Sequence, residues 1–155
     1  EAIHLRGGQT CSNGKEILTR EGNEFLLDID TPTRLVVEYP LDGDAQQLGE
    51  PRTVLDLRAV SSYPDGMVMT PDGQSIIIAM YNPENVREGE ARQHSLAVGR
   101  LEAVWKTPGS PRVTCPLLME LGGETVLFLT TAVEHMPEEE KTGQPNAGCL
   151  FRGVL

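Results

Sequence analysis

The sequence predicts an all-β protein made of about three blades of a β-propeller. Short apolar runs alternate with turn residues along the whole chain, and helical periodicity is nearly absent. A Ser-Asn-Gly motif at residues 12–14 and a Tyr-Pro-Asp-Gly motif at residues 63–66 each open a similar stretch. Asn13 and Asp65 lie 52 positions apart, a spacing that suits consecutive propeller blades.

The first repeat is expected at about residues 10–60 and contains four strand-like runs. Turn chemistry separates them, with Gly22-Asn23, Thr31-Pro32 and Asp42-Gly43 between successive runs. The four runs cover residues 15–18, 24–29, 35–39 and 52–57.

The second repeat, at about residues 61–108, follows the same order. A tight turn at Asp72-Gly73, which we interpret as purely structural, joins its first two runs, and a polar loop is expected at residues 82–93. The four expected strands cover residues 67–69, 75–80, 95–98 and 101–105.

The third repeat, at about residues 109–155, contains three expected strands and a long charged loop. The strands cover residues 113–118, 125–131 and 149–155, and the loop covers residues 134–144. The acidic stretch at residues 137–141 fits either one helical turn or a solvated acidic loop, and we expect the loop.

One strand recurs in all three repeats, at residues 25–28, 76–79 and 126–129. It is apolar on both faces, whereas a strand with one solvated face shows apolar and polar residues in alternation. The middle strands of a propeller blade lie between two other blades, so this pattern favours a propeller over a simple two-layer sandwich.

Composition excludes several classes of partner. The net charge is -10 and the pI is about 4.7, which argues against nucleic acid and anionic membranes because both recruit clustered Lys and Arg. No apolar run approaches the roughly 20 residues that span a bilayer. Cys11, Cys115 and Cys149 form no Cys-x-x-Cys pair, so we expect reduced, partly buried thiols in a cytoplasmic protein.

Asn13 and Asp65 are the candidate metal ligands. Their oxygen-bearing side chains recur at equivalent places in consecutive repeats, which suggests a ring with a cation on its axis. Hard divalent cations prefer carboxylate and amide oxygens. Asn-Gly and Asp-Gly are also favoured turn dipeptides, so a purely structural role for both residues stays open.

The order of these motifs, together with residues 28–34 and the Pro-Asn-Ala-Gly-Cys-Leu-Phe stretch at 145–151, resembles the C-terminal half of the SMP-30/gluconolactonase/luciferin-regenerating family. The resemblance covers about residues 10–155. It implies a six-bladed propeller that hydrolyses sugar lactones with one axial divalent cation, with Asn13 and Asp65 as ligands and Asp65 as the base. The family's Glu ligand and its substrate-binding Arg and Asn belong to the other half, so substrate-binding residues stay unassigned.

We therefore expect a divalent-metal-dependent hydrolase of small sugar-type lactones, with Asp65 as the catalytic residue. Calcium is the expected cation, and zinc, manganese and magnesium are alternatives. A missing N-terminal half or a second copy is expected to close the ring. The alternative is a non-catalytic propeller that binds a metal or a partner, which Lys15, a charge at the start of a core strand, supports.

Overall fold

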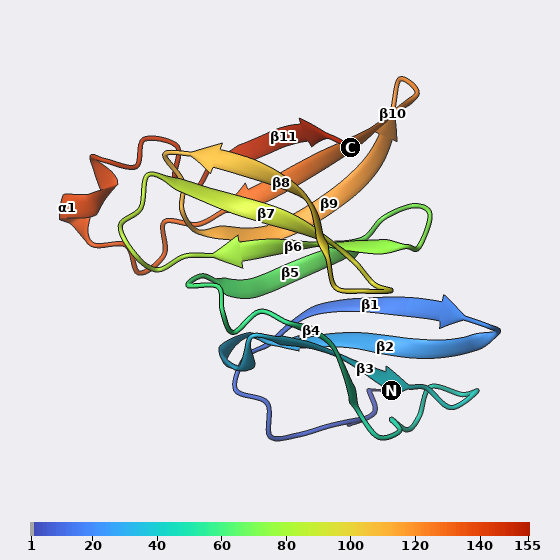
Figure 1. Ribbon diagram of the computed structural model, residues 1–155. Helices are drawn as coiled ribbons and strands as arrows, with labels where there is room; N and C mark the ends of the chain where they lie inside the picture. Colours follow the sequence, from blue (N-terminus) through green and yellow to red (C-terminus); the bar gives the residue numbers. More distant parts are fainter. Residues whose placement is uncertain (1) are drawn as a thin grey trace.

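The computed structural model describes residues 2–155 as three antiparallel sheets stacked side by side (Figure 1). Blade A contains β1 (Ser12–Arg20), β2 (Asn23–Asp30), β3 (Leu35–Pro40) and β4 (Arg52–Asp56). Blade B contains β5 (Tyr63–Met69), β6 (Ser75–Tyr81), β7 (Glu88–Ser95) and β8 (Leu101–Pro108). Blade C contains β9 (Val113–Leu121), β10 (Glu124–Thr131) and β11 (Leu150–Val154). Within each blade, strands adjacent in sequence are also adjacent in the sheet, so every connection is a hairpin.

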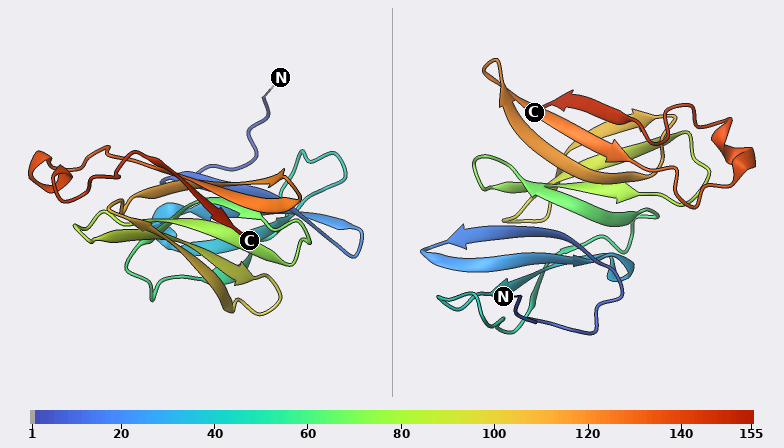
Figure 2. Two further views of the ribbon diagram at one scale, coloured as in Figure 1. Left: turned by 90° about the horizontal axis from the view of Figure 1, so that it is seen from above. Right: turned by 180° about the vertical axis from the view of Figure 1, so that it is seen from behind.

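The innermost strands β1, β5 and β9 lie next to one another, and the outer strands fan away from them (Figure 2). One apolar core fills the space between blades A and B, and a second fills the space between blades B and C. Ile76 and Ile78 of β6 face the first core, while Ile77 and Ala79 face the second. This arrangement explains the apolar run of β6, because both of its faces are buried.

The expected strands are confirmed in most places, but the third strand of blade B was misplaced. Residues 95–98 were expected to form it, whereas the strand is β7 and residues 96–98 form a turn. The sequence of β7, Glu-Gly-Glu-Ala-Arg-Gln-His-Ser, carries few apolar residues. Hydrogen bonding to β6 and β8 on its two sides holds this polar segment extended.

The charged loop after β10 forms a short helix, α1 (Glu138–Lys141), so the expectation of an entirely irregular loop was wrong. Polar contacts tie this loop to blade B. Gln144 Nε2 donates hydrogen bonds to Val86 O at 2.7 Å and to Asn85 Oδ1 at 3.1 Å. Asn146 Nδ2 donates to Pro108 O at 2.9 Å, which anchors the loop beside the end of β8.

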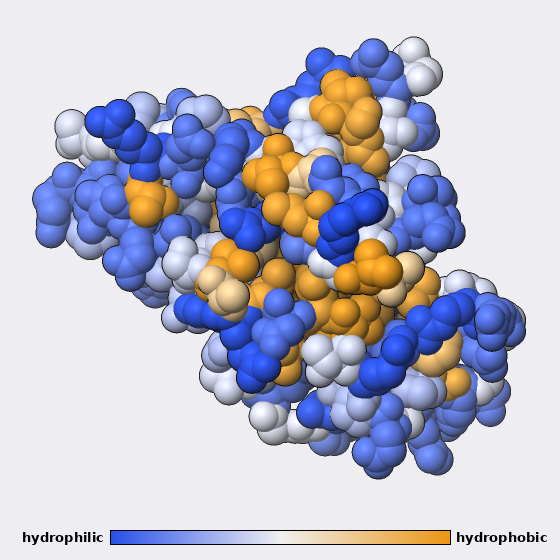
Figure 3. Space-filling model, viewed as in Figure 1, coloured by the Kyte–Doolittle hydropathy of each residue, from blue (hydrophilic) through white to orange (hydrophobic). Residues whose placement is uncertain are grey.

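The outer face of blade C is apolar and uncovered among residues 2–155. Figure 3 shows apolar surface in the upper part of the molecule, where this blade lies. The exposed apolar side chains of β9 and β11 on blade C are Leu117, Met119, Leu121, Leu150 and Val154.

The opposite end of the stack is closed differently. Residues 3–9 pass over the outer face of blade A, where Arg6 stacks on Tyr39. Lys15 Nζ lies 2.5 Å from Asp28 Oδ1, and the Asp28 side chain is only 3% exposed. The charge at the start of β1 is therefore neutralised by a buried partner directly across the strand pair, since Lys15 and Asp28 are in register.

None of the helices within residues 2–155 has the length and apolar character that crossing a membrane requires.

Candidate functional site

Asn13 and Asp65 lie at the same end of adjacent inner strands, each in a β-bulge. On β1 the pairing with β2 shifts between Ser12 and Lys15, and on β5 the pairing with β6 shifts between Pro64 and Met67. Both residues are thus within strands and not in the turns that the dipeptide chemistry left open. A bulge redirects a side chain from the regular pleat, and bulges are common beside active sites.

The glycine after each candidate ligand allows the inner strands to approach closely. A Cβ built on Gly14 would lie 2.8 Å from the backbone oxygen of Asp65, and one built on Gly66 would lie 2.8 Å from the backbone oxygen of Thr114. Such distances are shorter than a normal carbon–oxygen contact, so glycine is required at both positions. The Asn-Gly and Asp-Gly pairs therefore serve strand packing and place the preceding side chains near one another.

Asp65 is a half-buried carboxyl group beside Asn13. Burial raises the pKa of Asp65 to about 6, and a hydrogen bond from the Asn13 side chain partly opposes that rise. Among residues 2–155, no Lys, Arg or His forms an ion pair with Asp65. A desolvated carboxylate without a cationic side chain is a favourable place for a bound cation, because the cation would offset the cost of burying the charge.

The Asn13 side chain leaves its carbonyl oxygen available. Its Nδ2 donates to Thr31 Oγ1 at 3.0 Å, and Oδ1 accepts no hydrogen bond from the described part of the chain. Oδ1 of Asn13 and the carboxylate of Asp65 thus provide two oxygen donors of the type that hard divalent cations take. Residues 2–155 contain no cluster of three His, Cys, Asp or Glu side chains suited to a metal, so these residues fit part of a coordination shell.

A third bulge on β9, which the sequence did not reveal, lies at the matching position. The pairing of β9 with β10 shifts between Thr130 and Thr131, and Thr114 is the extra residue. Burial raises the pKa of the next residue, Cys115, and the negative charge of Asp65 adds to that effect. The bulge was missed because the segment at residues 113–115 lacks the glycine that marks the first two.

The thiols are more accessible than expected. Cys11 and Cys149 are exposed, so the expectation of partly buried cysteines was wrong for them, whereas the thiol of the largely exposed Cys115 is partly desolvated. Two of the three, Cys11 and Cys115, lie beside the bulges of β1 and β9.

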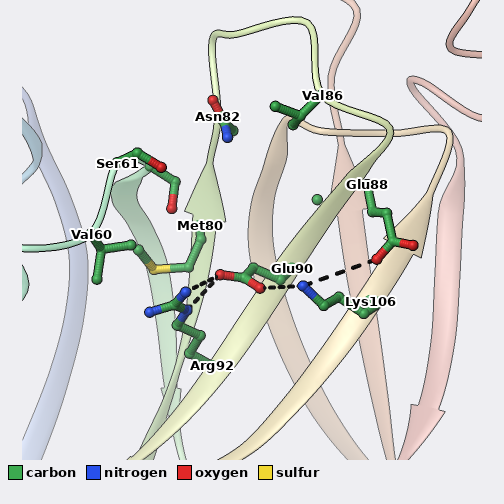
Figure 4. Close-up of a pocket in the computed structure, with 11 residues that line it drawn as sticks. Val60, Ser61, Met80, Asn82, Val86, Glu88, Glu90, Arg92 and Lys106 are labelled. Atoms are coloured by element: carbon green, nitrogen blue, oxygen red, sulfur yellow. Dashed lines mark hydrogen bonds and ion pairs between the residues drawn. The ribbon is translucent and has the colours of Figure 1, made fainter.

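A separate hollow of about 220 Å³ lies between the segment at residues 60–62 and blade B (Figure 4). Glu90 lies at its centre, 2.5 Å from Arg92 and 2.6 Å from Lys106, so its acidic and basic groups neutralise one another. Neither Asn13 nor Asp65 lines this hollow. We interpret the ion-pair network as a structural connection between β7 and β8.

Comparisons with known proteins agree with this geometry. A family model described as the SMP-30/Gluconolactonase/LRE-like region matches residues 1–133. A Bacillus subtilis (strain 168) protein named "Putative sugar lactone lactonase YvrE" is 29% identical over 155 residues, which are 99% of this chain and 49% of that protein.

Two solved structures share the fold. A calcium-binding protein, regucalcin, from Agrobacterium tumefaciens has a TM-score of 0.74 at 21% identity, over 93% of this chain and 46% of that chain. A luciferin-regenerating enzyme has a TM-score of 0.73 at 20% identity, over 97% of this chain and 48% of that chain. The chain thus spans about half the length of these relatives, and the expected fold of about three propeller blades is confirmed.

Proposed function

The chain belongs to the SMP-30/gluconolactonase/LRE-like family, and on that premise we propose that it supplies part of the active site of a divalent-metal-dependent hydrolase of small sugar-type lactones. The observation that carries the proposal is the meeting of Asn13 and Asp65 at two adjacent inner bulges. The name of the Bacillus subtilis relative, a sugar lactone lactonase, supports the substrate class.

Asn13 and Asp65 would hold the cation through Oδ1 and the carboxylate. A bound divalent cation would polarise the lactone carbonyl and stabilise the oxyanion that forms on attack by water. We propose calcium, because oxygen donors suit it and a relative of the same fold is described as a calcium-binding protein. Zinc, manganese and magnesium are alternatives that direct metal analysis would distinguish.

Asp65 would also act as the general base. In the absence of a cation its pKa is about 6, so its carboxylate is a stronger base than that of an ordinary aspartate. A bound divalent cation would lower this pKa and keep the carboxylate ionised at neutral pH, ready to take a proton from the attacking water. Asn13 supports this role, because its side-chain amide beside Asp65 favours the charged carboxylate.

We further propose that three additional blades complete the ring and supply the remaining ligand. The exposed apolar face of blade C supports this, since patches of this kind mark interaction surfaces. The partner would be either a preceding half of the same protein or a second copy of this chain.

Replacement of Asp65 tests the function. In the intact protein with calcium or manganese, Asp65→Ala should lower kcat/KM for glucono-δ-lactone at least about 100-fold, the contribution typical of a general base. Asp44→Ala, which removes an exposed turn carboxylate, is the matched control and should leave activity unchanged. Asn13→Ala should weaken metal binding measured by calorimetry.

Unchanged turnover in Asp65→Ala would contradict the assignment. Metal binding at Asn13 and Asp65 without hydrolysis of any sugar lactone would favour the alternative of a non-catalytic metal-binding propeller.

A further inference from the structure

The third inner strand repeats the bulge without repeating the sequence motif. On β9, Val113 pairs with Thr131 and Cys115 pairs with Thr130, which leaves Thr114 as the extra residue. In blades A and B, the pairing skips Asn13 with Gly14 and Asp65 with Gly66 at the same step, and the candidate ligand is the first residue skipped. Thr114 therefore occupies the position in blade C that the two candidate ligands occupy in their own blades.

The packing between blades supports the same equivalence. The Cα of Gly14 approaches the backbone oxygen of Asp65 just as the Cα of Gly66 approaches the backbone oxygen of Thr114, with 2.8 Å from a built Cβ in both cases. The backbone of Thr114 is therefore placed relative to that of Asp65 as the backbone of Asp65 is placed relative to that of Asn13. By backbone position, Thr114 therefore continues the row of Asn13 and Asp65 on the other side of Asp65.

The hydrogen bonds of Thr114 determine what its hydroxyl group offers. Oγ1 of Thr114 lies 2.8 Å from Oγ1 of Thr130, and Oγ1 of Thr130 lies 3.3 Å from the carbonyl oxygen of Cys115. The carbonyl only accepts, so Thr130 donates to it and Thr114 donates to Thr130. Both hydroxyl protons are then used, and the oxygen of Thr114 remains free to accept.

We propose that Thr114 is a substrate-binding residue whose hydroxyl oxygen accepts a hydrogen bond from a hydroxyl group of the sugar lactone beside Asp65. This inference rests on the proposed function and assigns a specificity residue to the same site. A site that accepts from a substrate hydroxyl discriminates against a lactone without one, because the substrate then leaves that acceptor unpaired.

The test compares two lactones of the same ring size on the intact, metal-loaded protein. Thr114→Val should lower kcat/KM for glucono-δ-lactone about three- to tenfold, the range of one neutral hydrogen bond, chiefly through a higher KM. It should leave kcat/KM for δ-valerolactone, which has no hydroxyl group, unchanged. Thr114→Ser should restore the preference for the hydroxylated lactone.

Thr125→Val is the matched control, because Thr125 lies at the other end of β10 with its hydroxyl on Glu120. Thr125→Val should leave kcat/KM unchanged for both lactones. An equal loss on both lactones in Thr114→Val would show a structural role and overturn the inference, as would an unchanged preference. Failure of the proposed function gives a different result, namely wild-type protein that hydrolyses neither lactone, and this would overturn the inference as well.

Discussion

Two glycines decide how near the candidate ligands come to each other. Gly14 and Gly66 are buried, and each allows the backbone of the next inner strand to approach a position where a side chain would collide. The spacing of the backbones that carry the candidate ligands is therefore set by strand packing. This is the kind of support that keeps a site pre-organised before a ligand binds.

We predict that Gly66→Ala lowers the free energy of unfolding by about 1–3 kcal/mol, the usual cost of an overpacked methyl group. The added Cβ would meet the Thr114 oxygen and the Cys115 backbone. Gly43→Ala is the control, because nothing lies within 4 Å of its built Cβ. Urea denaturation measures both, and an equal effect of the two substitutions would contradict the packing argument.

At the scale of residues, the sequence identified the two candidate ligands that a glycine follows and missed Thr114, which no glycine follows. Asn13 and Asp65 stood out because a glycine follows each, whereas Thr114 precedes a cysteine. A bulge is defined by the pairing partner, which no local motif specifies. The meeting of all three positions follows from tertiary packing and is visible only in the structure.

At the scale of elements, burial on both faces made β6 predictable and β7 hard to predict. β6 contributes to both cores, so its sequence is a continuous apolar run. β7 lies between β6 and β8 but carries Glu, Arg, Gln and His. Its extended form depends on ladder hydrogen bonds and on ion pairs such as Glu90 with Lys106, which composition does not indicate.

The end of β7 provides a pH-dependent contribution to stability. His94 is 6% exposed, and its Nδ1 lies 3.1 Å from the Gly99 carbonyl in the turn before β8. Burial lowers the pKa of His94 below 6.5, with Arg92 adding to the effect and the Gly99 hydrogen bond opposing it. The unfolded chain then binds more protons than the native state, so this contribution is present above about pH 6.5 and lost as pH falls through the native pKa.

We predict that His94→Gln reduces the loss of unfolding free energy between about pH 7 and pH 5.5. The exposed His135, replaced by Gln, is the control and should leave the pH profile unchanged. Urea denaturation at several pH values gives the free energy of unfolding of each protein. The raised pKa of Asp65 changes stability with pH in the opposite direction, but equally in all variants, so it cancels in the difference between them. Parallel profiles for wild type and His94→Gln would contradict the prediction.

The whole molecule is a stack of three blades with unlike ends. Residues 3–9 and the Lys15–Asp28 ion pair lie at the face of blade A, whereas the face of blade C presents apolar side chains to solvent. From the number of repeats, the sequence predicted about three blades, which are too few to close a ring. It did not predict the difference between the two faces, because Lys15 and Asp28 lie on opposite strands of a hairpin and become partners only through its register.

The proposed closure of the ring predicts that a thiol on blade C is protected. Cys115 is exposed at the inner edge of the uncovered face, so additional blades packed there should protect its thiol. In the intact native protein, maleimide labelling of Cys115 should be much slower than labelling of Cys149, with Cys115→Ser identifying the modified site. Native mass spectrometry would give the number of chains, and fast labelling of Cys115 would contradict closure at this face.

Cys115 occupies the position in blade C that Gly14 and Gly66 occupy in blades A and B, and this difference bears on how further blades would pack. Gly14 and Gly66 give two successive blades the same spacing, so either interface resembles the other. A further strand added at that spacing would collide with the Cβ of Cys115. In the proposed ring, an element packed beyond β9 would therefore stand farther away than β5 stands from β1. Such an irregular step would give an assembling ring a fixed starting point and would discourage blades from adding in the wrong number.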